Sequence, residues 1–148
     1  MNHRRFAGLP VSACLVLALA PGCGKGEPGL IPVKGRVTLD GGAWPKPGQI
    51  NFTPVESGAE GFRPGTGSFD IQGYFAASSF EKNDGLYPGT YKVAVQCWEE
   101  EPHEGPKGEM LSKSYIPKQY DNPQTSGFTV TVKPGGGTVE VNFDVKTK

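Results

Sequence analysis

Few side chains in this 148-residue chain have the types and spacing that catalysis requires. His103 is the only histidine after residue 22, and it stands in the acidic run Glu99-Glu100-Glu101-Pro102-His103-Glu104. Nucleophilic catalysis needs a general base held beside the nucleophile. A solvated charged turn is the simpler interpretation of this segment, so the sequence predicts a protein that is not an enzyme.

Metal-ligating residues are also sparse. Zinc needs closely spaced histidine or cysteine ligands, and this spacing does not occur after residue 22. The glutamates of 99–104, with Asp70 and Asp84 in predicted turns, concentrate the charge that calcium sites use. Calcium takes about six to eight oxygens from a defined loop, and EF-hand spacing is missing from the sequence. We therefore expect no cofactor, and the sequence leaves calcium binding by the 99–104 segment open.

The three cysteines have different predicted fates. Cys14 lies in an apolar N-terminal segment, and Cys23 directly follows Gly22. Cys97 lies within an apolar alternation, which predicts a small buried core residue rather than a reactive thiol. Only Cys97 remains in the part expected to fold, so no disulfide within the domain is expected.

The first 22 residues predict a secretory signal. Arg4 and Arg5 precede the apolar stretch 6–20, and small residues follow it. This stretch is shorter than the about 20 residues that span a bilayer. Ala20-Pro21-Gly22-Cys23 resembles a bacterial lipobox, in which the cysteine is lipidated and becomes the mature N-terminus. Ordinary secretion, with cleavage near Ala20 and a free Cys23, is the alternative.

Composition after the signal bounds the domain count and the partners. Removing 22 of 148 residues leaves 126, enough for one domain. The signal holds two arginines and no acid, so 13 basic and 15 acidic residues remain, a net charge of −2. Without a basic stripe, nucleic acid is not an expected partner. The segment 23–32 is rich in glycine and proline and predicts a tether, and 33–148 predicts the folded domain.

Period-two alternation predicts about seven strands, separated by glycine- and proline-rich turns. We expect the strands at 33–39, 49–53, 68–71, 74–77, 90–98, 128–133 and 139–146. Gly73 is expected to supply a positive φ in the turn between the third and fourth strands. The stretch 99–126 has no clear period and predicts a long loop, which is often functional.

These strands predict an all-β domain, a seven-stranded antiparallel β-sandwich of immunoglobulin-like architecture. Each strand has one wet and one dry face. The predicted inward set comprises Val33, Val37, Leu39, Ile50, Phe52, Phe69, Ile71, Phe75, Tyr91, Val93, Val95, Phe128, Val130, Val132, Val139, Val141, Phe143 and Val145.

Aromatic residues at strand ends and in loops are the remaining candidates for binding. Exposed rings stack on sugars or on a partner protein, and Trp44, Trp98, Tyr115 and Tyr120 are the candidates. The alternative is that these rings cover the sheet edges beneath the long loop. Some surface proteins form an isopeptide cross-link between a lysine of the first strand and an Asn or Asp of the last strand. Lys34 and either Asn142 or Asp144 occupy these strands here, but the alternation places them on the solvent-exposed faces, away from the core.

Three segments together resemble carboxypeptidase regulatory-like domains. They are Val33 to Gly41 (VKGRVTLDG), Phe69 to Phe75 (FDIQGYF) and Leu86 to Val95 (LYPGTYKVAV). Phe69 and Gln72 depart from the T-D-x-D-G-x-F pattern of that family. With the lipobox-like start, the segment 115–127 also resembles small lipoproteins common in Planctomycetes. The resemblance implies a transthyretin-like (prealbumin-like) fold of seven strands and says little about activity.

Transthyretin-related hydrolases are the enzymatic alternative. Hydroxyisourate hydrolases depend on several histidines and a C-terminal Tyr-Arg-Gly-Ser, whereas this chain ends Asp-Val-Lys-Thr-Lys. We therefore expect a non-enzymatic lipoprotein of the cell envelope, periplasm-facing or on the outer surface. Its partners are the membrane, through the lipid on Cys23, and an envelope protein or glycan. Its role is structural or that of a binding module acting through exposed aromatics.

Overall fold

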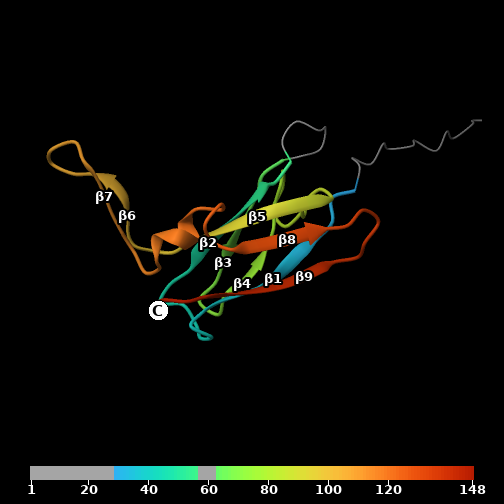
Figure 1. The fold of residues 1–148 in the computed structure, drawn as a ribbon, viewed down its shortest axis with the longest axis horizontal. Coiled ribbons are helices and arrows are strands. Elements are labelled where there is room, and N and C mark those ends of the chain that lie inside the picture. Colours follow the sequence, from blue (N-terminus) through green and yellow to red (C-terminus); the bar gives the residue numbers. More distant parts are fainter. Residues whose placement is uncertain (1–28, 57–62) are drawn as a thin grey trace, which may run out of the picture.

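The structure is a computed structural model that describes residues 29–56 and 63–148 (Figure 1). The signal segment, Cys23 and residues 24–28 of the predicted tether lie outside the described residues. The described part folds into strands with one short 3-10 turn, so the predicted all-β class is confirmed. The elements are β1 Val33–Leu39, β2 Gly48–Pro54, β3 Gly65–Phe69, β4 Tyr74–Ala76, β5 Gly89–Gln96, β6 Trp98–Glu104, β7 Met110–Ser114, η1 Lys118–Asp121, β8 Phe128–Val132 and β9 Val139–Val145.

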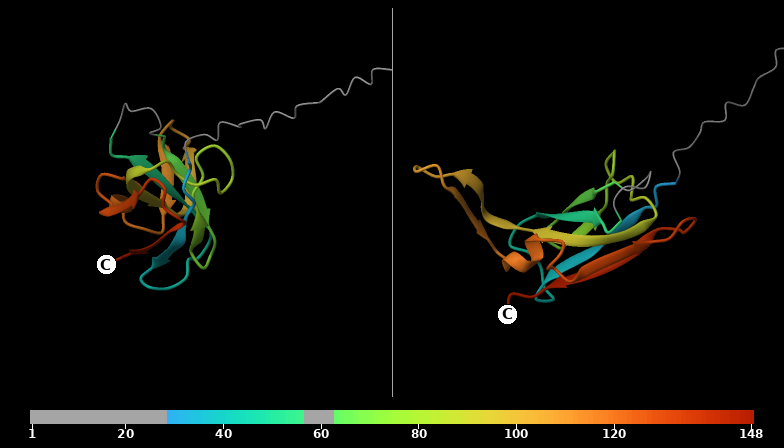
Figure 2. Two further views of the ribbon diagram at one scale, coloured as in Figure 1. Left: turned by 90° about the vertical axis from the view of Figure 1, so that its right-hand side faces the viewer. Right: turned by 45° about the horizontal axis from the view of Figure 1, so that its top comes forward.

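Seven strands form one sheet in the order β8-β5-β2-β3-β4-β1-β9. The sheet is mixed rather than antiparallel, because β1 and β9 pair in parallel along their length. It curls until the edge strands β8 and β9 approach each other, with the ring centroids of Phe128 and Phe143 4.9 Å apart (Figure 2). The seven predicted strands therefore form this sheet, but the predicted two-layer antiparallel sandwich is wrong, because the described residues form one curled mixed sheet and a separate two-stranded sheet of β6 and β7. Alternation fixes which face of a strand is buried, not the direction of its neighbour.

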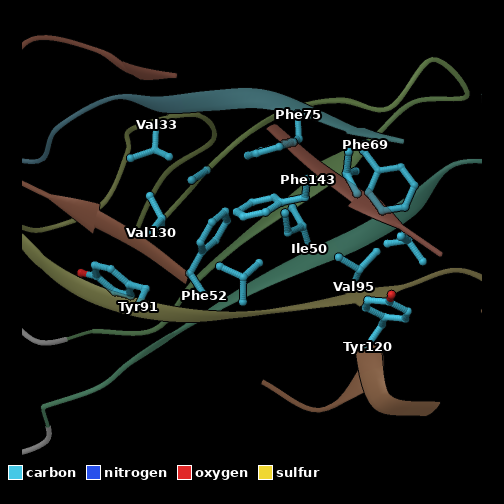
Figure 3. Packing of buried hydrophobic residues seen from close by; sticks show 14 of the residues in the cluster. Val33, Ile50, Phe52, Phe69, Phe75, Tyr91, Val95, Tyr120, Val130 and Phe143 are labelled. Carbon is cyan, nitrogen blue, oxygen red and sulfur yellow. The ribbon is translucent and has the colours of Figure 1, made fainter. Parts of the chain in front are cut away.

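The core fills the inside of the curled sheet (Figure 3). Most of the predicted inward set is buried: Val33, Val37, Ile50, Phe52, Phe69, Phe75, Tyr91, Val93, Val95, Val130, Val132, Phe143 and Val145. Leu39, Phe128, Val139 and Val141 are half-buried and pack against this cluster. The alternation that identified the strands therefore also identified the core.

Ile71 is the exception in the inward set, with 49% of its surface exposed. Strand β3 ends at Phe69, and the next four residues form a tight turn. The Asp70 carboxylate accepts the backbone N–H of Gln72 at 2.9 Å and of Tyr74 at 3.0 Å. Gly73 has φ +86, as predicted, and a Cβ there would lie 1.8 Å from the Val37 carbonyl oxygen. The turn's own hydrogen bonds therefore override the alternation at Ile71.

The packed domain begins before the predicted end of the tether at residue 32. Ile31 is buried, and its backbone exchanges two hydrogen bonds with Leu86, of 2.8 and 3.0 Å. Leu86 is itself fully buried at the start of the L-x-P-G segment. Ile31 stands in a short segment with glycine and proline on either side, where the sequence has no alternation of apolar and polar residues. Its pairing with Leu86 therefore could not be predicted from the sequence.

Strands also occupy the first part of the predicted 99–126 loop. Strands β6 and β7 form a two-stranded hairpin, called the arm from here on, which projects from the body at the end opposite the start of β1 (Figure 1). Most of its residues are exposed. Since both faces are wet, the arm has no hydrophobic alternation to predict it. The rest of the segment packs on the body through Ile116, Tyr120 and Ser126, all buried.

Candidate binding groove at Trp98

Trp98 lies where the chain leaves the body and enters the arm. It follows β5 by one residue and opens β6. Tyr91, Val93, Val95 and Cys97 point into the core, so the alternate positions Gln96 and Trp98 are on the outer face. The Trp98 side chain is half-buried. Its ring therefore stands at the junction of sheet and arm.

A groove of about 380 Å³ opens on one side of Trp98. We call it the Trp98 groove, and its lining includes Lys46, Gln49, Ser68, Gln96, Trp98 and Glu101. The floor comes from three neighbouring strands, because Gln49 of β2 is paired with Ser68 of β3 and with Gln96 of β5. Glu101 contributes a wall from the arm. The groove thus requires the sheet and the arm together.

A polar network holds Gln96 from two sides. Asn51 Nδ2 donates to Gln96 Oε1 at 3.3 Å, and Gln96 Nε2 donates to the carboxylate of Asp121 in η1. Thr66 Oγ1 donates to Asn51 Oδ1 at 3.2 Å. The side chains of Gln49 and Ser68 make no hydrogen bond within residues 29–56 and 63–148. The groove floor thus holds one fixed carboxamide, that of Gln96, beside the side chains of Gln49 and Ser68, which are available to a ligand.

Gly48 lets the strand beneath the groove pack closely against the core. A Cβ at Gly48 would lie 2.3 Å from a ring carbon of Phe69 and 2.4 Å from the Gln96 carbonyl oxygen. No side chain fits in that space without movement of the backbone or of a buried ring. Lys46 Nζ also donates to the Glu99 carbonyl at 3.2 Å, which ties the start of β2 to the base of the arm.

Cys97 lies beneath the groove and is buried, as predicted. Its Sγ is 3.6 Å from the Lys46 carbonyl oxygen. Burial raises the pKa of the thiol above its ordinary value of 9.0, and the nearby Lys46 only partly opposes this. The thiol is therefore protonated at neutral pH, which suits packing rather than nucleophilic attack.

A second hollow, of about 400 Å³, lies on the other side of Trp98. Ser112 and Ser114 of β7 line it together with Lys118 and Asp121 of η1. Trp98 is the residue that the two hollows share. The indole is therefore reachable from two directions.

Of the four predicted aromatic candidates, two are not exposed. Trp44 is 4% exposed, donates from Nε1 to the Val37 carbonyl at 2.7 Å, and packs 4.7 Å from the Phe69 ring centroid. Tyr120 belongs to the buried cluster of Figure 3 and is 7% exposed. Its ring stacks on that of Phe128, with the ring centroids 5.4 Å apart. Both are core residues, which corrects the prediction that they present their rings to a ligand. Trp44 lies in an irregular segment and Tyr120 in the short 3-10 turn η1, where no strand alternation signals burial.

Tyr115 is half-buried against the core, and its backbone N–H donates to the Cys97 carbonyl at 3.0 Å. It therefore helps to seal the segment after the arm onto the body, the alternative given above for these aromatics. Only Trp98 of the four lines the two hollows. Cys23, the predicted lipid site, lies outside the described residues.

The other sequence candidates are exposed and separate. His103 lies on the arm with Nε2 3.4 Å from Glu100 and Nδ1 2.9 Å from the Glu101 carbonyl. Lys34 pairs with Glu140 at 3.0 Å on the outer face, rather than with Asn142 or Asp144. Within residues 29–56 and 63–148, no three His, Cys, Asp or Glu side chains gather as metal ligands. In the same part of the chain, no helix is long and apolar enough to cross a membrane.

Sequence reasoning missed the polar residues of the groove. The alternation of polar and buried residues along the strands predicted that the side chains of Gln49, Ser68 and Gln96 face solvent. Their proximity depends on β2 lying between β3 and β5, and the sequence does not state that order.

Comparisons with known proteins give no further guide. No protein-family model, no curated protein and no solved structure matches the chain. The likeness to carboxypeptidase regulatory-like domains therefore stays a prediction from the three segments quoted above.

Proposed function

We propose that this chain is a non-enzymatic lipoprotein of the cell envelope, and that its β-domain binds an envelope component through the Trp98 groove. The groove carries the proposal. It combines a half-buried indole with the Gln49 carboxamide and the Ser68 hydroxyl, which make no side-chain hydrogen bond among the described residues. Binding sites use such convergent polar groups beside an aromatic surface.

The lipobox-like segment supports anchoring. A lipid on Cys23 would be eight residues from Ile31, the first buried residue in the part of the chain that the structure describes. Eight extended residues span at most about 29 Å. Bacterial lipoproteins carry several acyl chains, as stable attachment requires. The lipid would thus keep the domain within one domain diameter of the membrane.

The position of the groove supports a role in binding away from the anchor. Ile31 pairs with Leu86, just before β5 begins at Gly89, whereas the groove lies where β5 ends, at Gln96 and Trp98. Eight strand residues rise about 26 Å. Ile31 and the groove therefore lie at opposite ends of β5. The arm continues from the groove end of the sheet (Figure 2).

Fractionation tests the anchor. The wild-type chain is expected in the membrane fraction and the Cys23→Ser chain in the soluble fraction. The same distribution of the two chains between the fractions would contradict anchoring through a lipid on Cys23.

Capture of envelope material tests the groove. Soluble Cys23→Ser protein is immobilised, and solubilised cell envelope is passed over it. Trp98→Ala is expected to lose the retained material. Tyr74→Ala is the matched control, because Tyr74 is an aromatic with 59% exposure that lies outside the groove. Equal retention by wild type and Trp98→Ala contradicts the proposal.

A further inference from the structure

The Trp98 groove does not end at Ser68. A further hollow of about 230 Å³ shares Gln49 and Ser68 with it and continues across β3 and β4 to Thr66, Ser78, Lys82 and Asn83. Because the two hollows share Gln49 and Ser68, they lie side by side on the outer face of the sheet. We call the two together the outer channel.

The outer channel is long compared with a single small ligand. From Trp98 beside β5 it crosses β2 and β3 to β4, which are consecutive neighbours in the sheet. Three spacings between strands amount to about 14 Å. This length exceeds one sugar ring and suits a chain of several units.

The chemistry of the outer channel suits a hydroxyl-rich ligand. Its exposed polar groups are hydroxyls and carboxamides, which both donate and accept hydrogen bonds. Lys46, Glu101 and Lys82 contribute charges of both signs, so no strong field favours a polyanion or a polycation. Trp98 supplies the apolar surface on which a sugar ring stacks.

The far end of the outer channel is held in place before any ligand arrives. Thr66 and Ser78 exchange two backbone hydrogen bonds, of 2.9 and 2.7 Å. The Asn83 backbone N–H donates to Ser78 Oγ at 2.8 Å, and Asn83 has φ +63. The Asp84 carboxylate accepts the backbone N–H groups of Ser79, Phe80 and Glu81. Such preorganisation lowers the entropic cost of binding.

We propose that the ligand of this domain is a linear glycan that lies along the outer channel, with one ring stacked on Trp98 and a later unit beside Lys82 and Asn83. This inference rests on the proposed function, because it uses the same groove. It adds the chemical class of the ligand and its direction across the strands.

Calorimetric titration of the full Cys23→Ser chain tests the inference. The probes are chito-, cello- and malto-oligosaccharides of one to six units. At least one series is expected to bind, with affinity rising tenfold or more from one unit to six. Trp98→Ala is expected to weaken binding at every length, and Tyr74→Ala at none.

A far-end variant separates a long site from a short one. Lys82→Ala with Asn83→Gly keeps a residue that tolerates positive φ at position 83. It is expected to weaken binding of the six-unit probe while leaving the two-unit probe unchanged. Equal affinity for the one-unit and six-unit probes, or an unchanged six-unit affinity in this variant, overturns the linear arrangement of the glycan. Neither result contradicts binding at the Trp98 groove. Failure of every probe to bind overturns the glycan itself, and the capture experiment above still decides the proposed function separately.

Discussion

The two tryptophans of this chain are predicted to respond oppositely to truncation. Trp44 is 4% exposed and packs on Phe69, so Trp44→Ala should destabilise the fold by about 3 to 5 kcal/mol. Trp44→Phe keeps most of the packing but leaves the Val37 carbonyl without its indole donor, at a cost of about 1 to 3 kcal/mol. Trp98 stands at the surface of the groove, and Trp98→Ala should cost about 1 kcal/mol or less.

Urea unfolding followed by far-ultraviolet circular dichroism measures these differences. With a slope of about 2 kcal/mol per molar urea, Trp44→Ala moves the midpoint down by about 1.5 to 2.5 M. Trp98→Ala moves it by about 0.5 M or less. A midpoint shift for Trp98→Ala as large as that for Trp44→Ala would refute the assignment of Trp98 to an open groove. A Trp44→Ala midpoint within 0.5 M of wild type would refute the assignment of Trp44 to the core.

Three further predictions concern single residues. Gly48→Ala should lower the urea midpoint, since its Cβ would lie 2.4 Å from the Gln96 carbonyl; an unchanged midpoint contradicts the close packing at the groove floor. Burial raises the pKa of Asp84, but hydrogen bonds from the backbone N–H groups of residues 79–81 outweigh it and hold the pKa below 3.8. Asp84 therefore stabilises the fold above pH 3.8, and this contribution is lost as the pH falls through the lower folded-state pKa. When the free energy of unfolding is measured from strong acid to pH 7, Asp84→Asn should be less stable than wild type at pH 7 and should approach wild type in strong acid. A difference in unfolding free energy that stays constant with pH contradicts this. Cys97 should resist thiol reagents in the native protein and react in urea, and rapid native labelling would show that the thiol is not buried.

The regular part of the fold was predictable because local alternation encodes it. Strand β9 is the clearest case, with Phe143 and Val145 buried between wet neighbours. Gly73 was predictable as well, since its turn needs a residue with positive φ. The parallel pairing of β1 with β9 was not predictable, because it joins residues about a hundred positions apart and leaves no local pattern.

The candidate site was predictable only in part. Trp98 was selected as an aromatic at a strand end, but Trp44 was selected on the same ground and is buried. What separates them is tertiary: Trp44 folds back onto Phe69, whereas Trp98 continues the outer face of β5 into the arm. The groove itself depends on which strands are neighbours, and so its carboxamides could not be grouped from the sequence.

The fluorescence of Trp98 tests the central claim, that the Trp98 groove binds an envelope component. Trp44→Phe leaves Trp98 as the sole tryptophan, and Trp98→Phe leaves Trp44. Acrylamide should quench Trp98 strongly and Trp44 weakly, and solubilised envelope should protect Trp98 from quenching without changing Trp44. Quenching of Trp98 that stays the same with and without envelope material would contradict the account.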